Sequence, residues 1–347
     1  MKPSSWLCAS FFVLAGHAQA AVTATILAGG GTDVPVDTPS RRLDTAGEFA
    51  FVGALAISGG GGSYKGSAVA LSPEWVLTAG HNVDLNDDGL PDALWSGTFH
   101  LPGVGSFGVA QAFTHPGFTG FAKPAVNDDL ALLRLATPLP VGVGFPTLAS
   151  AAGLGEVITM VGFGRSGYGS YGYTSNATLT DRRFGSNVID SFQADDEGSG
   201  QAEVFRYDFD APGSTGLPGG SLGNGIETMI GPGDSGGAAL RMGAGGWELV
   251  GINTFTEGYG GSFGDTGGGV LVAPYADWIA QTTRVPEPGT VGLVMLGVVA
   301  AAWRRVRVAI STPGPGLAKA PTPGILAVAS WRLRFPERGL RLGGRVG

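Results

Sequence analysis

The middle of the chain consists of short apolar runs that alternate with glycine-rich turns. Runs rich in β-branched and aromatic residues recur, among them FAFVGALAI (49–57), EVITMVGF (156–163) and WELVGINTF (247–255). Glycine makes up 62 of the 347 residues, and no convincing amphipathic helix accompanies these runs. Runs of this length bounded by turn residues are typical of β-strands. We therefore expect an all-β fold.

The first twenty residues have the pattern of a secretory signal peptide. Lys2 precedes the apolar stretch WLCASFFVLAG, and Ala18-Gln19-Ala20 gives a small-x-small cleavage site. Cys8, the only cysteine, lies inside this segment. We therefore expect residues 1–20 to be removed on export, leaving a mature chain without disulfides.

The segment VPEPGTVGLVMLGVVAAAWRRVR, residues 285–307, places Pro-Glu-Pro before an apolar run and three arginines after it. It resembles the PEP-CTERM sorting signal of Gram-negative bacteria, and this resemblance implies processing by an exosortase-type enzyme. The apolar part, residues 291–303, is shorter than the roughly 20 residues of a spanning helix. A transient membrane association is therefore expected, with a permanent anchor as the alternative.

Positive charge is concentrated after this segment. Residues 304–347 carry 9 Lys and Arg against 1 acid, which leaves 12 against 27 in residues 1–303, a formal charge near −15. Such a charge argues against nucleic acid or an anionic membrane as a partner of the folded part. The Pro/Gly-rich basic tail, residues 308–347, is expected to be disordered, discarded or an artefact of the gene model.

One serine lies in a loop that suits a nucleophile. Ser235 stands in GPGDSGGAAL, and a serine hydroxyl needs a base and a group that orients the base. Outside the signal peptide the chain has three histidines, His81, His100 and His115. His81 follows the strand-like run WVLTAG, whose small last residues allow close approach to its ring. The other two are expected to be structural or solvent-facing.

We expect the acid that orients the histidine at the start of a strand, because burial there strengthens the interaction between a carboxylate and an imidazole. VNDDLALLRLATPL places Asp128 and Asp129 before an apolar run, and capping of that strand would explain both residues as well. The order His81, Asp129, Ser235 has contextual support at each position. An α/β-hydrolase order would require a histidine after Ser235, and the chain has none there.

Three motifs in this order, TAGH, NDDLALLRL and GDSGG, resemble those of the trypsin-like (chymotrypsin) family of serine proteases. WELVGINTF and GGGVLVAPYADWI resemble the family's substrate-pairing strand and its closing strand with a terminal helix. The resemblance spans about residues 48–280. It implies a domain over residues 21–284 with two six-stranded antiparallel β-barrels, a boundary near residue 150 and a short C-terminal helix.

The resemblance also implies a function, that of an exported, secreted or envelope-bound serine endopeptidase acting on protein substrates through an acyl-enzyme. Ser235 would attack the scissile carbonyl, His81 would transfer the proton, and Asp129 would hold His81. The N–H groups of Gly233 and Ser235 would form the oxyanion hole. No cofactor is required for this chemistry.

The same comparison assigns a specificity pocket, with Met229 at its floor and Thr254, Phe255 and Thr256 along its walls. A methionine cannot neutralise a lysine or arginine, so we expect a preference for apolar or small side chains. Glu227, two residues before Met229, would change this preference if the loop were remodelled.

Several residues depart from the family pattern. Asn82 and Gly231 stand where cysteines are usual, and Ala238 replaces a proline. Asp234 would pair in the family with a freed N-terminal amine, yet no Ile-Val-Gly-Gly start precedes the domain. Arg41-Arg42-Leu43 offers a processing site instead. If no amine reaches Asp234, another cation must do so, or the loop stays disordered.

The segment DLNDDGLPD, residues 84–92, resembles the start of a calcium loop, with oxygen ligands expected from Asp84, Asn86, Asp88 and Asp92. The final bidentate acid is missing, since Trp95 stands at its position. A structural Ca²⁺ and an acidic, solvated turn both explain this segment.

Two other functions remain as alternatives. The first is an inert surface protein that uses the trypsin fold for binding, and it predicts no reaction with acylating or phosphonylating probes. The second is a serine esterase of α/β-hydrolase type, which predicts a substantial helical content.

Overall fold

The computed structural model describes residues 42–121, 126–211, 220–222, 227–258 and 260–284. The predicted signal peptide (1–20), sorting signal (285–307) and tail (308–347) lie outside these ranges. The described residues belong to one compact unit.

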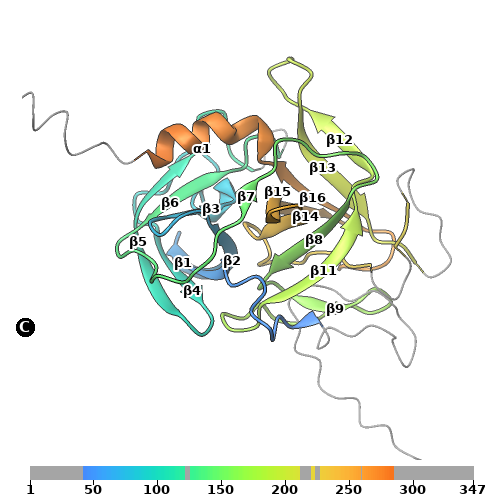
Figure 1. Ribbon diagram of the computed structural model, residues 1–347, viewed down its shortest axis with the longest axis horizontal. Coiled ribbons are helices and arrows are strands. Elements are labelled where there is room, and N and C mark those ends of the chain that lie inside the picture. The colour runs from blue at the N-terminus through green and yellow to red at the C-terminus, as the bar shows by residue number, and fades with distance from the viewer. Residues whose placement is uncertain (1–41, 122–125, 212–219, 223–226, 259, 285–347) are drawn as a thin grey trace, which may run out of the picture. The chain divides into compact units, whose positions relative to one another are not determined.

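Six strands of the N-terminal half form a closed antiparallel barrel, in the order β1-β2-β3-β6-β5-β4 (Figure 1). The strands are β1 (Val52–Gly59), β2 (Gly62–Ala70), β3 (Trp75–Thr78), β4 (Ser96–Leu101), β5 (Gly105–Thr114) and β6 (Ala131–Leu135). All four residues of β3 and four of the five in β6 are buried, and the two strands pair antiparallel in the barrel. The 3₁₀ turn η2 (Gly80–Asn82) follows β3 directly.

The C-terminal half forms an eight-stranded sheet. Seven strands follow the order β11-β8-β14-β15-β16-β13-β12, and β7 pairs in parallel with β15. They are β7 (Thr147–Leu148), β8 (Val157–Gly162), β11 (Arg183–Val188), β12 (Ser191–Ala194), β13 (Ala202–Asp208), β14 (Ala238–Gly243), β15 (Gly246–Glu257) and β16 (Thr266–Leu271). A separate hairpin contains β9 (Ser166–Tyr168) and β10 (Gly172–Ser175).

A 3₁₀ turn, η3 (Ala273–Tyr275), leads into the C-terminal helix α1 (Ala276–Thr283). Ile279 of α1 is buried in the larger hydrophobic cluster, and the Trp278 ring contacts His115 of the barrel half. None of the helices in the described ranges is long and apolar enough to cross a bilayer.

One hydrophobic cluster runs from the barrel into the second sheet. It joins barrel residues such as Leu55 and Leu77 to Val161 of β8 and Ile252 of β15. A smaller cluster around Phe205 and Tyr207 lies within the second sheet. The expected all-β class is confirmed, including the closed six-stranded barrel and the short C-terminal helix. The second sheet contains eight strands and is consistent with the second barrel that we expected from the sequence.

Candidate active site

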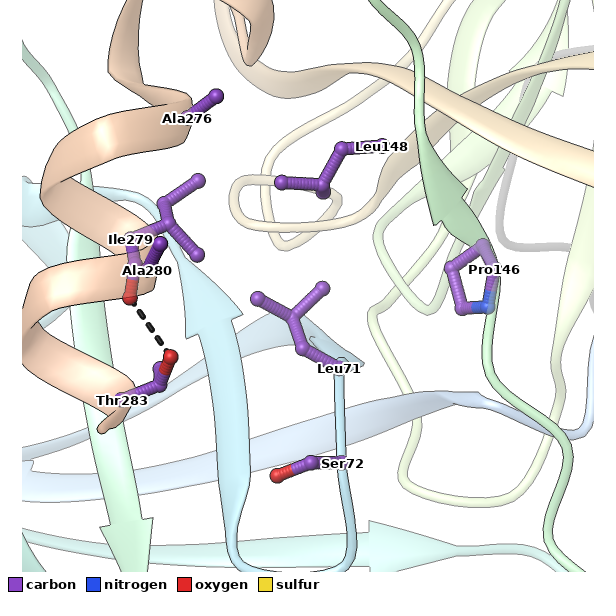
Figure 2. Close-up of a pocket in the computed structure, with 8 residues that line it drawn as sticks. All are labelled: Leu71, Ser72, Pro146, Leu148, Ala276, Ile279, Ala280 and Thr283. Atoms are coloured by element: carbon purple, nitrogen blue, oxygen red, sulfur yellow. Dashed lines mark hydrogen bonds between the residues drawn. The ribbon is translucent and has the colours of Figure 1, made fainter. Parts of the chain in front are cut away.

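Two pockets differ sharply in their chemistry. The first, of about 240 Å³, lies between α1 and the turn after β2 (Figure 2). Its lining is mainly apolar, and its Thr283 hydroxyl donates to the Ile279 carbonyl at 2.7 Å within the helix. Because no titratable side chain lines this pocket, we place the candidate site elsewhere.

The second pocket, of about 180 Å³, contains both His81 and Ser235. Residues 254–256 of β15 form part of its wall, together with Phe121 and the segment 230–232. The base and the nucleophile expected from the sequence therefore face the same cavity, although 154 positions separate them in the chain. Phe121, whose ring centroid lies 4.5 Å from that of His81, was not anticipated.

His81 is held by two hydrogen bonds to one carboxylate. Its ring Nδ1 lies 2.7 Å from Asp129 Oδ2, and its backbone N–H donates to Asp129 Oδ1 at 2.8 Å. Asp129 is fully buried, whereas 21% of the His81 side chain is exposed. A Cβ at Gly80 would lie 3.1 Å from Asp129 Oδ1, so the small residue before His81 leaves room for the carboxylate.

The turn before β6 gives the two adjacent aspartates different partners. Asp128 has a left-handed backbone, with φ of +59°, which aspartate tolerates better than most residues. Its carboxylate pairs with His115 Nδ1 at 2.7 Å, while that of Asp129 pairs with His81. The chain therefore contains two histidine–aspartate pairs built from consecutive acids.

The pKa of His81 reflects opposing effects. Burial of the ring lowers it, whereas the charge and hydrogen bond of Asp129 raise it, with smaller contributions from Asp87 and Asp84. The net result is a pKa above the ordinary value of 6.5. An imidazole held in this way is suited to accept a proton and to be stabilised once charged.

The Ser235 hydroxyl donates to the backbone carbonyl of Thr254 at 3.4 Å. Both Ser235 and His81 lie within the described ranges, and no hydrogen bond joins their side chains. Catalytic contacts are often long or misaligned without substrate.

Two backbone N–H groups in the nucleophile loop have no protein acceptor among the described residues, those of Gly233 and Ser235. Gly233 has φ of +101°, a conformation that favours glycine, and its carbonyl accepts a hydrogen bond from Ser67 Oγ at 2.9 Å. The loop geometry thus leaves both predicted oxyanion donors available.

Asn82 was noted in the sequence only as a departure from the family. Its side-chain amide donates to the Ser235 carbonyl and to Thr78 Oγ1, both at 2.9 Å. The Ser67 N–H also donates to the Ser235 carbonyl, at 2.8 Å. Asn82 therefore links the segment that carries the base to the backbone of the nucleophile. Its position next to His81 is the one signal in the sequence that could have suggested this.

Asp234 is fully buried, and its carboxylate has donors inside the domain. It accepts hydrogen bonds from the N–H groups of Gly164 at 2.7 Å and Gly231 at 2.8 Å. Burial raises its pKa well above the ordinary value, while these N–H groups and the charge of buried Arg183 act in the opposite direction. Arg183 is a buried cation whose charge acts on Asp234, although its own ion pair is with Asp181 at 3.2 Å.

The predicted specificity residues separate into two groups. Thr254, Phe255 and Thr256 line the pocket beside Ser235. Met229 is fully buried in the smaller hydrophobic cluster and is absent from the pocket lining. The structure therefore brings together the predicted walls but not the predicted floor.

The acidic loop 84–92 is closed by its own hydrogen bonds. Asp84 accepts from the N–H groups of Asp88 and Gly89, and Asp92 accepts from that of Leu85. The Asn86 side-chain amide donates to Asp88 Oδ2, and Asn86 Oδ1 accepts the Asp88 backbone N–H, both at 3.2 Å. Among the described residues, no three carboxylates of this loop lie close enough together to share one ion. Calcium binding there stays a prediction.

The remaining histidines lie outside the pocket. His100 on β4 contacts Ser106 Oγ through Nδ1 at 2.6 Å, and burial lowers its pKa. His115 packs edge-on against Tyr275 and Trp278 near the C-terminal helix.

Comparisons with known proteins give two family matches. The family model described as Trypsin matches residues 40–203, a segment that includes His81 and Asp129 and ends before Ser235. The PEP-CTERM protein-sorting motif matches residues 284–307, and such a motif indicates export to the cell envelope of Gram-negative bacteria. Together these matches suggest an exported protease.

Among solved structures, the chain is similar to neuropsin, a serine protease expressed in the limbic system of mouse brain. The two are 19% identical with a TM-score of 0.48, over 70% of this chain and 98% of neuropsin. Among curated proteins, none matches this sequence significantly.

Proposed function

We propose that this chain is an exported serine endopeptidase whose protease domain spans residues 21–284, because residues 40–203 match the trypsin family model and residues 284–307 match the PEP-CTERM sorting motif. The observation that carries the proposal is that His81, whose Nδ1 lies 2.7 Å from the buried Asp129 carboxylate, lines the same pocket as Ser235. This arrangement supports the roles of base, orienting acid and nucleophile.

In the proposed reaction, Ser235 Oγ attacks the carbonyl carbon of the scissile peptide bond while His81 Nε2 removes the hydroxyl proton. The buried Asp129 fixes the ring with its Nδ1 protonated and stabilises the imidazolium. His81 then donates the proton to the leaving amine, and an acyl-enzyme forms on Ser235. Water, deprotonated by His81, releases the acid product and restores the serine.

The N–H groups of Gly233 and Ser235 are proposed to bind the oxyanion that forms in this attack. Their lack of protein acceptors supports the assignment, since a donor already engaged would have to break a bond first. Loss of one such donor typically costs about 3 kcal/mol in the transition state. The chemistry uses side chains and backbone alone, so no cofactor enters it.

The nucleophile loop is proposed to order without a freed N-terminal amine. Two N–H groups already bond the Asp234 carboxylate, and the charge of Arg183 acts on it from inside the domain. In addition, Leu43 pairs with Arg183 in an isolated β-bridge, and Arg42 beside it is buried. A protease cutting near Arg42 would therefore have to displace this segment first.

The substrate is proposed to be an extracellular protein or peptide with an apolar or small side chain before the cleaved bond. Thr254, Phe255 and Thr256 supply the pocket wall, and none of the lining side chains is a carboxylate. Cleavage of peptide libraries measures this preference directly. Dominant cleavage after lysine or arginine would contradict it.

Export and processing complete the proposal. An exosortase-type enzyme would act at residues 285–307, after a transient membrane association of residues 291–303. Mass spectrometry of the exported protein checks both ends. We expect a start at Ala21 and an end near residue 285, and a chain that retains residues 291–303 would indicate the permanent anchor.

Fluorophosphonate labelling of the full chain tests the catalytic assignment. We expect a single adduct on Ser235 that is lost in Ser235→Ala and strongly reduced in His81→Gln. Ser262→Ala, outside the pocket, should label normally. A folded protein that shows no adduct would favour the inert binding alternative. Among the described residues the strands pair antiparallel apart from the short β7–β15 pair, whereas an α/β-hydrolase esterase requires a parallel sheet.

A further inference from the structure

A group of buried carboxylates lies in the second sheet, outside the catalytic pocket. Three residues each place one carboxylate oxygen within 4.8 Å of the other two: Asp208, Asp210 and Glu227. Asp208 is the last residue of β13. These three residues are 8%, 3% and 0% exposed. Asp190, which follows β11, joins the group because its Oδ2 accepts the Asp208 N–H at 2.8 Å. Like charges at this separation repel one another strongly when water is excluded.

Several of these buried oxygens have no donor. Asp210 Oδ2, Glu227 Oε1 and Asp190 Oδ1 are buried without a hydrogen-bond partner. Among the described residues, no ion pair involves these three carboxylates. Glu227 Oε2 accepts from Ser221 Oγ at 3.0 Å, which satisfies one oxygen only. Unpartnered buried acceptors are rare in native proteins, and a bound water or a bound cation is a common explanation for them.

The electrostatics agree with this geometry. Burial, together with the charges of the neighbouring Asp210, Asp208 and Asp190, raises the pKa of Glu227 to about 7, although the Ser221 hydrogen bond acts in the opposite direction. Burial also raises the pKa of Asp190 to about 7, with Asp208 and Asp210 adding to the effect. The charged forms are therefore disfavoured unless a positive charge lies among them.

We propose that Asp208, Asp210 and Glu227 bind a calcium ion in the second sheet, with Asp190 beside them. The potential ligands are all oxygens, which suits a hard cation. Calcium binds oxygen at about 2.3–2.6 Å, so ligands on opposite sides of it lie about 5 Å apart, compatible with the observed spacing. Magnesium usually takes one or two carboxylates and retains several waters, so a cluster of this charge favours calcium.

This ion would brace the segment that leads to the nucleophile. Glu227 lies eight positions before Ser235 and starts the stretch that ends in GDSGG. Asn187 bridges the two sides, since its amide donates to the carbonyls of Asp208 at 2.8 Å and Thr228 at 2.9 Å. Calcium would therefore tie β13 to the base of the nucleophile loop.

The acidic loop 84–92 provides a matched contrast. Its Asp84 and Asp92 accept backbone N–H groups, so their charge is stabilised without an ion. In the buried group, one carboxylate oxygen each of Asp190, Asp210 and Glu227 has no such donor. Replacing one aspartate by asparagine in each region therefore shows which of the two sites binds calcium.

Calcium binding and thermal unfolding of the full chain test the proposal, in a Ser235→Ala background so that catalysis and self-cleavage play no part. With millimolar CaCl₂ in place of EDTA, we expect one ion bound per chain in a calorimetric titration and a Tm higher by about 5–10 °C. MgCl₂ should give a clearly smaller shift.

Asp210→Asn should abolish both the bound ion and the Tm shift, whereas Asp88→Asn should retain both. Glu227→Gln serves as the second variant if Asp210→Asn does not fold. The proposal fails if the parent protein neither binds calcium nor gains stability from it. It fails equally if Asp88→Asn alone removes the effect, or if magnesium stabilises the protein as much as calcium.

Discussion

The two histidine–aspartate pairs have nearly the same internal geometry and entirely different surroundings. In each, Nδ1 lies 2.7 Å from an oxygen of a buried aspartate, and the two aspartates are neighbours in the chain. The ring of His81 faces the pocket with Ser235, whereas that of His115 packs against Tyr275 at 4.8 Å and Trp278 at 5.0 Å. A histidine–aspartate pair is therefore insufficient to mark a catalytic site.

The His115 pair instead connects parts of the fold. Its Asp128 N–H donates to the Tyr275 hydroxyl at 3.2 Å, which joins the start of β6 to the turn before α1. Burial, together with the charges of Asp128 and Glu203, raises the pKa of Tyr275 far above its ordinary value. This tyrosine therefore stays protonated and remains a structural contact. The difference between the pairs lies in the neighbours of each ring.

The largest expected effect comes from neutralising one acid of each pair. Asp129→Asn should lower kcat by about 10⁴-fold, because the ring would be held in the wrong tautomer and its charge left without a counterion. Asp128→Asn should change kcat by less than about threefold and lower the Tm instead. Steady-state kinetics on a peptide substrate, with calorimetry for each variant, measures both. Equal losses of kcat would remove the distinction between the pairs.

The pH dependence of kcat/KM sharpens the comparison. Only neutral His81 can act as the base, so activity should rise with pH through a pKa above 6.5 and fall about tenfold per pH unit below it. Asp129→Asn removes the interactions that raise this pKa and leaves the burial that lowers it, so its acidic limb should move to lower pH. In Asp128→Asn, the acidic limb of the pH profile should stay where it is in the parent protein. If Asp128→Asn shifts this limb instead, the base is His115.

Asn82 tests whether the base and the nucleophile are positioned as one unit. Asn82→Asp keeps the shape but removes the amide that donates to the Ser235 carbonyl. We expect kcat to fall about tenfold with KM within about twofold, since a misplaced nucleophile affects the reacting geometry more than binding. Asn86→Asp, an equal change in the acidic loop, is the control and should leave kcat unaltered. A loss in KM alone would point to substrate binding instead.

The smallest effect on activity is expected at the structural pair. His115→Gln should lower the Tm by about 4–8 °C, since a buried hydrogen bond to a carboxylate is typically worth about 1.5–3 kcal/mol. Because His115 lies outside the pocket, kcat/KM below the Tm should stay within about twofold. A large fall in kcat/KM without loss of Tm would show that this pair takes part in the chemistry after all.

Local patterns predicted much of the fold and part of the candidate site. Alternating apolar runs and glycine turns indicated an all-β domain, because these preferences arise within a few residues. The small residues before His81 and the apolar run after Asp129 also marked local environments. The family resemblance, and not a local pattern, placed Met229 at a pocket floor, and the structure buries its side chain in a core cluster formed by long-range packing.

The sequence by itself determined which residues were eligible for each role: a single serine in a GDSGG loop, three histidines beyond the signal peptide and a pair of adjacent aspartates. Only the tertiary structure decided which acid reached which histidine, because the left-handed turn at Asp128 sends neighbouring carboxylates to different partners. It also brought Asp190, Asp208, Asp210 and Glu227 together from separate segments. Burial and charge depend on such distant contacts, and no local pattern encodes them.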